Sequence, residues 1–179
     1  VALSTGRLTS RLRIREREER EREKKTNALF LYSRAIGSAS DVPSLISVAA
    51  GQISQIMGVR LAVMTPEGGG GKLRLWETGG EYAMDEKEWS VAVWCMEHRR
   101  PAGRFTDTIP VAEGFYLPMM SGERCMGVLG VRPEEEECLT AGQKDLLESM
   151  GAQLAMALER EELRAERART RLMRSEEHT

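Results

Sequence analysis

Two highly charged stretches near the ends of the chain limit most strongly how it can fold. Residues 11–25, RLRIREREEREREKK, contain eight Lys or Arg and five Glu. The residues that follow Glu159, REELRAERARTRLMRSEE, have the same character. In the first stretch a Glu repeatedly stands four residues before a basic residue, an order that stabilises solvent-exposed helices. Such charged stretches avoid a core, so we expect a globular middle with a charged helix leaving it at each end.

Composition supports a folded middle and excludes several classes of function. Apolar residues make up 41% of the 179 residues, which is enough for a buried core. The net charge of −2 and the isoelectric point of about 5.9 argue against a nucleic-acid partner, because nucleic-acid binders usually carry a basic excess. No uninterrupted apolar run approaches the roughly 18 residues of a membrane span. We therefore expect no direct membrane insertion of this segment.

Cysteine and histidine are too few to suggest a metal site or a disulfide framework. The three cysteines are Cys95, Cys125 and Cys138, and no C-x-x-C motif is present. The two histidines, His98 and His178, are far apart in sequence. Zinc sites and small disulfide-rich domains need denser spacing of these residues. We expect no metal, no cofactor and no catalytic residue in this chain.

Hydrophobic periodicity predicts the order of the elements. A helix that gains a buried face at Ala28 should end near Gly37–Ser40, and a second helix should begin at a Ser40 or Asp41 cap and stop at Gly58. Two strands, a helix over 85–99 and a loop over 100–113 should follow. The helix over 85–99 is expected to bury one face, formed by Trp89, Ala92, Val93 and Met96. Two further strands joined at 121–123, and a last helix capped by Thr140 and Gln143, complete the order. Gly127, inside a strand, predicts a close approach by a neighbouring group.

This order resembles a GAF domain, and FYLPMMSGERCMGVLGV resembles the hairpin of that family. Together HRRPAGRFTDTIP, YLPM and GVLGVRPE, with REREE ahead of ALFLYSRAI, resemble the GAF segment of KdpD-type sensor histidine kinases over about residues 7–175. The resemblance implies an α+β fold: an antiparallel sheet with the terminal helices packed on one face and long charged helices at both ends. It implies three parts, a charged signalling helix over 1–26, a GAF-like sensor domain over 27–160 and a charged helix over 161–179 that leads towards a phosphoacceptor domain.

The same resemblance implies a role in signal transduction. The segment would be the cytosolic GAF sensing and transmission domain of a two-component sensor histidine kinase that regulates potassium uptake and osmosensing. It would be non-catalytic itself, although the parent kinase is a phosphotransferase of the inner or plasma membrane. Its partners would be the other domains of that kinase and a small-molecule ligand of unknown identity, which would act by shifting the populations of two packing states.

Six residues are the candidates for a ligand pocket. RFTDTIP would lie at the mouth of a GAF pocket, where polar groups orient ligands, although Asp and Thr also make local hydrogen bonds in turns. The candidates are Trp94, Thr106, Asp107, Thr108, Tyr116 and Met126. One alternative is a structural dimerisation spacer without a ligand, which a pocket filled by Met64, Trp94, Met119 and Met126 would favour. A remote alternative is a thiol-dependent methionine sulfoxide reductase, because some GAF enzymes of this type use three cysteines.

The charged ends are also candidates for a dimer interface. Leu158, Ala165 and Leu172 are spaced seven residues apart, and Leu154 and Ala168 extend the stripe. Such spacing is typical of a coiled-coil seam, here a thin one with few large apolar residues. We expect residues 11–25 to run beside this helix, and the pair to meet its copy across a twofold axis in a homodimer.

Overall fold

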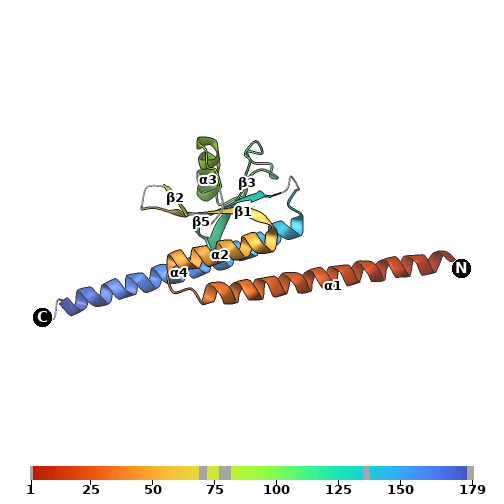
Figure 1. Cartoon of the computed structure of the whole chain (residues 1–179), viewed down its shortest axis with the longest axis horizontal. Coiled ribbons are helices and arrows are strands. Elements are labelled where there is room, and N and C mark those ends of the chain that lie inside the picture. The colour runs from red at the N-terminus through yellow and green to blue at the C-terminus, as the bar shows by residue number, and fades with distance from the viewer. Residues whose placement is uncertain (1, 69–71, 77–81, 135–137, 177–179) are drawn as a thin grey trace.

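The computed structural model describes residues 2–68, 72–76, 82–134 and 138–176. In chain order the elements are α1 (Ala2–Gly37), α2 (Val42–Met57), β1 (Val59–Pro66), β2 (Leu73–Trp76), α3 (Glu86–His98), β3 (Ala102–Gly103), β4 (Phe115–Ser121), β5 (Arg124–Pro133) and α4 (Ala141–Glu176). The strands form one antiparallel sheet in the order β2-β1-β5-β4-β3. Helices α1, α2 and α4 lie on one side of the sheet and α3 on the other (Figure 1). The α+β class predicted from the sequence is confirmed.

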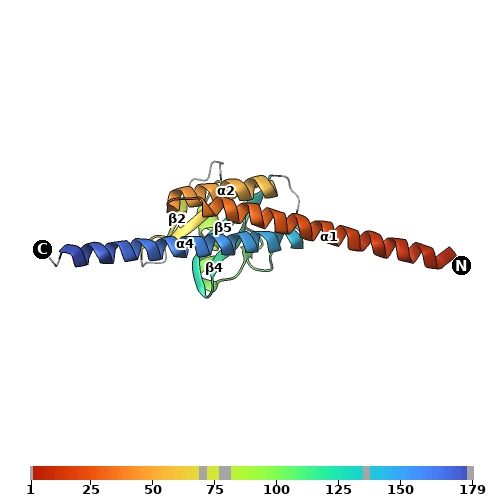
Figure 2. The same ribbon diagram turned by 90° about the horizontal axis from the view of Figure 1, so that it is seen from below.

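The two long helices α1 and α4 run in the same direction and protrude from opposite ends of the domain (Figures 1 and 2). Residues 10–24 of α1 and 162–173 of α4 are exposed. Only the last part of the charged N-terminal stretch, residues 21–25, lies beside α4, where it lines a groove near the start of that helix. The stretch is therefore a solvated helix, as predicted. The expectation that residues 11–25 run beside the C-terminal helix therefore holds for residues 21–25 and is wrong for the rest of the stretch, because the two extensions leave the domain at opposite ends.

Local hydrogen bonds set the ends of the helices. The Asp41 carboxylate accepts from the Ser44 backbone N–H at 2.7 Å and caps α2. Gly58 ends α2 in the left-handed conformation, with φ 63°, which glycine adopts without steric cost. Thr140 and Gln143 satisfy each other's backbone N–H groups at 2.8 and 3.2 Å. All three signals were predicted from short stretches of sequence.

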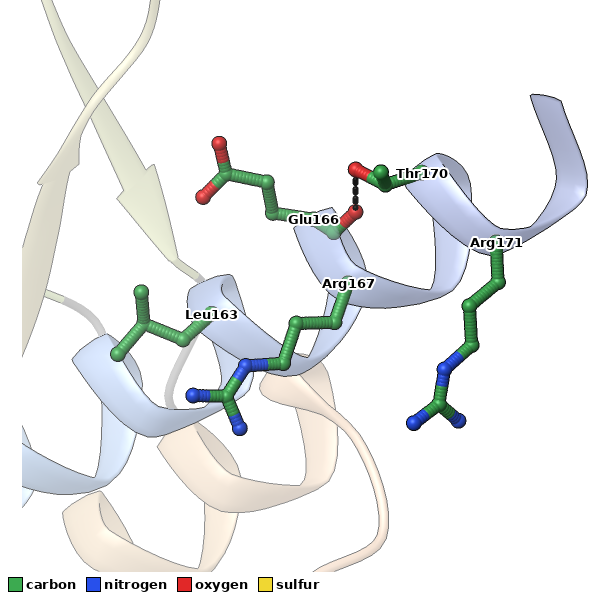
Figure 3. A pocket seen from close by; sticks show the side chains of 5 residues that line it. All are labelled: Leu163, Glu166, Arg167, Thr170 and Arg171. Carbon is green, nitrogen blue, oxygen red and sulfur yellow. Dashed lines mark hydrogen bonds between the residues drawn. The ribbon is translucent and has the colours of Figure 1, made fainter. Parts of the chain in front are cut away.

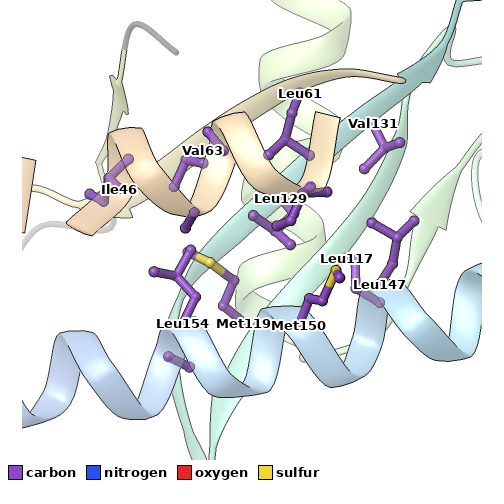
Figure 4. Close-up of a cluster of buried hydrophobic side chains, with 14 of the residues drawn as sticks. Ile46, Leu61, Val63, Leu117, Met119, Leu129, Val131, Leu147, Met150 and Leu154 are labelled. Atoms are coloured by element: carbon purple, nitrogen blue, oxygen red, sulfur yellow. The ribbon is translucent and has the colours of Figure 1, made fainter. Parts of the chain in front are cut away.

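The larger core lies between the sheet and the three helices on its first face. Figure 4 shows side chains of α2 and α4 meeting those of β1, β4 and β5. In α4, Leu147, Met150 and Leu154 recur at helical spacing and are fully buried. Burial of each such side chain stabilises the fold by about 1.5–3 kcal/mol. This layer, which we call the helix-side core, holds the first half of α4 against the sheet.

The hairpin between β4 and β5 contains an irregularity beside its turn. The register shifts between Met119 and Met120, and Gly127 stands opposite Met119. A Cβ atom placed at Gly127 would lie 2.1 Å from the Met64 carbonyl oxygen, a distance that real side chains do not tolerate. The predicted close approach at this glycine is confirmed, and the neighbour is the backbone of β1.

Candidate functional site

A buried carboxylate lies on the α3 face of the sheet. The Glu88 side chain on α3 is 1% exposed. Its Oε1 accepts the backbone N–H of Glu113 at 2.9 Å. Its Oε2 accepts the backbone N–H of Gly114 at 3.0 Å and the hydroxyl of Tyr116 at 2.6 Å. One carboxylate therefore joins α3, the segment ahead of β4 and β4 itself.

Arg132, near the end of β5, balances the charge of this carboxylate. Its Nη2 lies 3.3 Å from Glu88 Oε2, and its Nη1 lies 3.4 Å from the Glu113 carboxylate. Its side chain is only 11% exposed. Within the described part of the chain, the buried Nε of Arg132 has no hydrogen-bond partner.

Two tyrosines complete the cluster. The Tyr82 hydroxyl donates to the Tyr116 hydroxyl at 3.4 Å, and Tyr116 donates to Glu88 at 2.6 Å. The guanidinium of Arg132 stacks over the Tyr82 ring, with its Cζ 4.5 Å from the ring centroid. Met84 also contacts this group, because its sulfur lies 3.5 Å from the Tyr116 hydroxyl. We call Glu88, Arg132, Tyr82 and Tyr116 the carboxylate cluster.

The surroundings shift the pKa values of these groups in opposite directions. Burial raises the pKa of Glu88, but the hydrogen bonds from Tyr116, from two backbone N–H groups and from Arg132 outweigh it, and the pKa is lowered overall. Burial raises the pKa of Tyr82 to about 12 and that of Tyr116 further. At neutral pH the cluster therefore holds a carboxylate, a guanidinium and two neutral phenols.

The buried face of α3 differs from the face that was predicted. Val91, Ala92 and Cys95 are buried together with Glu88, whereas Trp89 is only half-buried. Of the predicted inward residues, Ala92 is buried and Trp89 and Met96 pack half-buried against the apolar cluster under α3, but the fully buried face is centred on Glu88, Val91, Ala92 and Cys95. On the correct stripe, Glu88 is the one charged residue among apolar ones, which is the signal that would have found it.

The structure separates the six predicted pocket residues. Trp94 and Tyr116 both belong to the apolar cluster between α3 and the sheet. Trp94 also stacks on His98, with ring centroids 4.1 Å apart. Met126 is buried in the helix-side core, on the other face of the sheet. It therefore does not join Trp94 and Tyr116, because the bulge beside Gly127 changes the side to which this part of β5 points.

The loop predicted to line a pocket mouth is a tight local turn. The Thr106 hydroxyl lies 2.7 Å from the Gly103 carbonyl and 2.8 Å from the Thr108 carbonyl, and it accepts the Thr108 backbone N–H at 3.1 Å. Thr106 and Thr108 are half-buried, and Asp107 is exposed. Two of the three polar residues thus hold the turn beside β3, and the carboxylate of Asp107 is the group that faces solvent.

The residues predicted for a dimer seam fall into two groups. Leu154 and Leu158 are 0% and 4% exposed and belong to the helix-side core. They are therefore engaged within one subunit and do not offer a contact surface. Ala165, Ala168 and Leu172 lie on the exposed extension of α4. The exposed apolar residues of α4 in this region include Met156 and Leu163, which are also seven residues apart.

The three cysteines are free thiols that differ in exposure. Cys95 is buried, and burial raises the pKa of its thiol; burial also raises the pKa of Cys125. Cys138 is exposed.

Within residues 2–68, 72–76, 82–134 and 138–176, no three His, Cys, Asp or Glu side chains are grouped so that they could hold a metal ion. In the same ranges, no helix is both long and apolar enough to cross a membrane.

The sheet and the helices on its two faces define a known class of domain. Residues 41–160 match the GAF domain family, and the chain belongs to that family. Among solved structures, the GAF domain of the potassium sensor histidine kinase KdpD from Escherichia coli is similar, with a TM-score of 0.66 and 28% identity over 79% of this chain and 97% of that chain.

Similarity to the sensor protein KdpD extends beyond the GAF match. The protein from Escherichia coli K12 is 29% identical over 173 residues, which cover 96% of this chain. The protein from Clostridium acetobutylicum is 26% identical over 196 residues, which cover 99% of this chain. This chain is therefore a GAF domain homologous to that of KdpD. It spans about a fifth of the length of these relatives, 19% and 22% respectively.

Proposed function

We propose that this chain is the sensing and transmission segment of a KdpD-like sensor histidine kinase that regulates potassium uptake. The supporting observation is that similarity to KdpD covers 96% of the chain, whereas the GAF family match covers residues 41–160. The similarity therefore includes most of both helical extensions, which a ligand-binding domain alone would not need. In this role the segment is a non-catalytic, cytoplasmic part of a membrane-bound kinase.

The sheet is connected to α4 in a way that suits transmission. Gly151 of α4 lies close to the sheet, and a Cβ atom there would be 3.2 Å from Leu129 and 3.8 Å from Leu117. At the point where α4 leaves the domain, Glu159 accepts from the Ser121 hydroxyl at 2.5 Å and from Arg124 at 3.1 Å. A small movement of β4 and β5 would therefore shift or rotate α4, as in known helix-shift transitions.

The transmission role includes a homodimer, for which α4 offers a different seam from the predicted one. Met156, Leu163 and Thr170 are spaced by seven residues, and Leu163 and Thr170 border an open depression of about 320 Å³ (Figure 3). In a parallel two-stranded coiled coil with these residues at d positions, Glu166 would face Arg171 of the partner subunit, which is a complementary pair. The seam lacks further large apolar residues, so we expect weak association that can change with signal.

A chimeric kinase tests the proposed function. This chain would replace the aligned segment of Escherichia coli KdpD, and autophosphorylation would be measured at low and high potassium. We expect potassium-dependent activity to be retained. The matched control removes four residues from the α4 extension, which turns the following helix by about 40° at 3.6 residues per turn and should abolish the regulation. A chimera that is unresponsive to potassium although its GAF domain is folded would refute the proposal.

The packing under α3 supports a second candidate, the structural spacer without a ligand. Of the four side chains expected to fill a collapsed pocket, Met64 and Trp94 pack in the cluster between α3 and the sheet, whereas Met119 and Met126 lie in the helix-side core on the other face. Thermal-shift measurements against nucleotides, cyclic dinucleotides and potassium salts would separate the candidates, because a specific ligand stabilises the folded state by mass action. Retained regulation in the chimera without any stabilising ligand would favour the spacer.

The remote candidate, a methionine sulfoxide reductase, is disfavoured by the thiols. Such chemistry needs a thiolate at neutral pH with a second thiol in reach. The pKa values of Cys95 and Cys125 are instead raised, in both cases mainly by burial. Consumption of free methionine sulfoxide in the presence of a thiol reductant would revive this candidate.

A further inference from the structure

The Tyr82 side chain lies on the α3 face of the sheet, against Gly114 and Gly130. A Cβ atom placed at Gly114 would lie 2.3 Å from the Tyr82 hydroxyl oxygen, and one at Gly130 would lie 3.0 Å from it. The hydroxyl end of the Tyr82 ring therefore lies directly against the backbone of two glycines. A side chain at either position would occupy the same space. We call the space bounded by Gly114, Gly130, Tyr116 and Arg132 the phenol slot.

The polar groups of the slot match a hydroxylated aromatic ring. Arg132 stacks over the ring of Tyr82 at 4.5 Å, an arrangement that stabilises aromatic rings through their negative faces. The hydroxyl of Tyr82 donates to Tyr116, which in turn donates to the buried carboxylate of Glu88. The buried Nε of Arg132 is a further donor without a partner in the described residues.

Tyr82 makes a longer hydrogen bond to the site than the wall residues make with one another. Tyr82 lies in the stretch 82–85, which is neither helix nor strand, whereas the walls belong to β4, β5 and the backbone that α3 binds through Glu88. The bond from Tyr82 to Tyr116 is 3.4 Å long, against 2.6 Å for the bond from Tyr116 to Glu88. The walls are thus connected to one another without Tyr82.

We propose that the phenol slot is a ligand site for small monocyclic phenols, and that such a ligand displaces the Tyr82 ring. This inference rests on the sensing role proposed above and names the chemistry of its ligand. Tyr82 acts as an internal competitor, so the apparent affinity of the ligand is reduced by the fraction of molecules in which the slot is vacant. Displacement changes the contacts of Tyr116 on β4, the strand that packs on α4.

Fluorine NMR on the full chain tests whether a phenol displaces the Tyr82 ring. The protein has three tyrosines, so each resonance can be assigned and followed separately. The chain would be labelled with 3-fluorotyrosine and the resonances assigned by Tyr→Phe variants. On titration with p-cresol we expect saturable changes of the Tyr82 and Tyr116 resonances. Tyr32, buried in the helix-side core, should not change and serves as the internal control. Toluene, which has the ring without the hydroxyl, should bind at least about tenfold more weakly, as the loss of a 1.4 kcal/mol hydrogen bond implies.

A variant that lacks the Tyr82 ring provides a second test of the proposal. Tyr82→Ala should bind p-cresol at least about tenfold more tightly than the unmodified chain, because the slot is then permanently vacant. Binding to Tyr82→Ala together with an unchanged spectrum of the unmodified chain would overturn the proposal, since Tyr82 would then be a fixed core residue. Movement of all three resonances together would overturn it too, since it would indicate non-specific binding. Potassium regulation retained in the chimera would show that only the ligand assignment had failed.

Discussion

Removal of the Glu88 carboxylate should destabilise the protein far more than removal of a surface carboxylate. Glu88→Ala leaves the Tyr116 hydroxyl, the backbone N–H groups of Glu113 and Gly114, and Arg132 without their buried partner. Breaking a buried ion pair on one side costs about 3–5 kcal/mol. We expect about 3 kcal/mol, the lower end, because Arg132 keeps a contact with Glu113 and is not completely buried.

Urea unfolding measures this loss as a decrease in the midpoint at constant slope. The matched control is Glu97→Ala, since Glu97 is an exposed carboxylate on the same helix and should change stability by no more than about 0.5 kcal/mol. A double variant, Glu88→Leu with Arg132→Met, should be less destabilised than the sum of the single changes, because it leaves no unpaired charge. If Glu88→Ala costs less than about 1 kcal/mol, the carboxylate is not buried as described and the argument fails.

The lowered pKa of Glu88 predicts how stability depends on pH. The pKa of Glu88 is lowered in the folded state, so its contribution is present above the ordinary glutamate value of 4.5 and is lost as the pH falls through the folded-state value. The difference in unfolding free energy between the unmodified chain and Glu88→Gln should therefore be largest near neutral pH and should shrink below about pH 4.5. A difference that grows on acidification would contradict the assigned direction of the pKa shift.

Three further changes test other parts of the structure. Gly127→Ala should destabilise by at least about 1–3 kcal/mol because its Cβ would overlap the backbone of β1, whereas Gly142→Ala, with open space around it, should be neutral or stabilising in urea unfolding. Thr106→Val should lower the free energy of unfolding by about 1 kcal/mol, because it removes the hydroxyl that holds the turn. Asp107→Ala should leave the free energy of unfolding nearly unchanged. If Asp107 contacts a ligand, Asp107→Ala should abolish only the thermal shift that the ligand induces. Met156→Glu with Leu163→Glu should shift a dimer to a folded monomer in light scattering, whereas Leu158→Glu should unfold the domain; a fragment that is monomeric at high micromolar concentration would refute the seam.

Helix boundaries and element order could be predicted because their causes are local. Asp41, Gly58 and Thr140 each act on backbone groups within four residues, so a short window of sequence contains the whole interaction. The buried stripes of α2 and α4 follow from periodicity in the same way. The same reasoning explains why Leu158 was misassigned: one periodic stripe can continue from a core into a solvated extension, and periodicity does not show where the core ends.

The carboxylate cluster could not be predicted, because its members come from separate elements. Glu88 is on α3, Tyr116 on β4 and Arg132 on β5, and only the folded sheet brings them together. Charged residues are rarely fully buried, so a Glu on a helix is expected to face solvent unless a partner is visible nearby. The partner here is distant in sequence. The position of Glu88 among small apolar residues was the one local sign of its burial.

The arrangement of β4 links the two faces of the sheet and explains how a change under α3 would affect the outgoing helix. Tyr116 belongs to the carboxylate cluster, and Leu117, the next residue, faces the helix-side core close to Gly151 of α4. The same strand ends at Ser121, which binds Glu159 where α4 leaves the domain. β4 is paired with β3 at Phe115 and Tyr116 and with β5 along its whole length, so these contacts connect Tyr116 to the rest of the strand. A displacement of Tyr116 would therefore be felt at two separate points on α4, and two points of contact can rotate a helix as well as shift it.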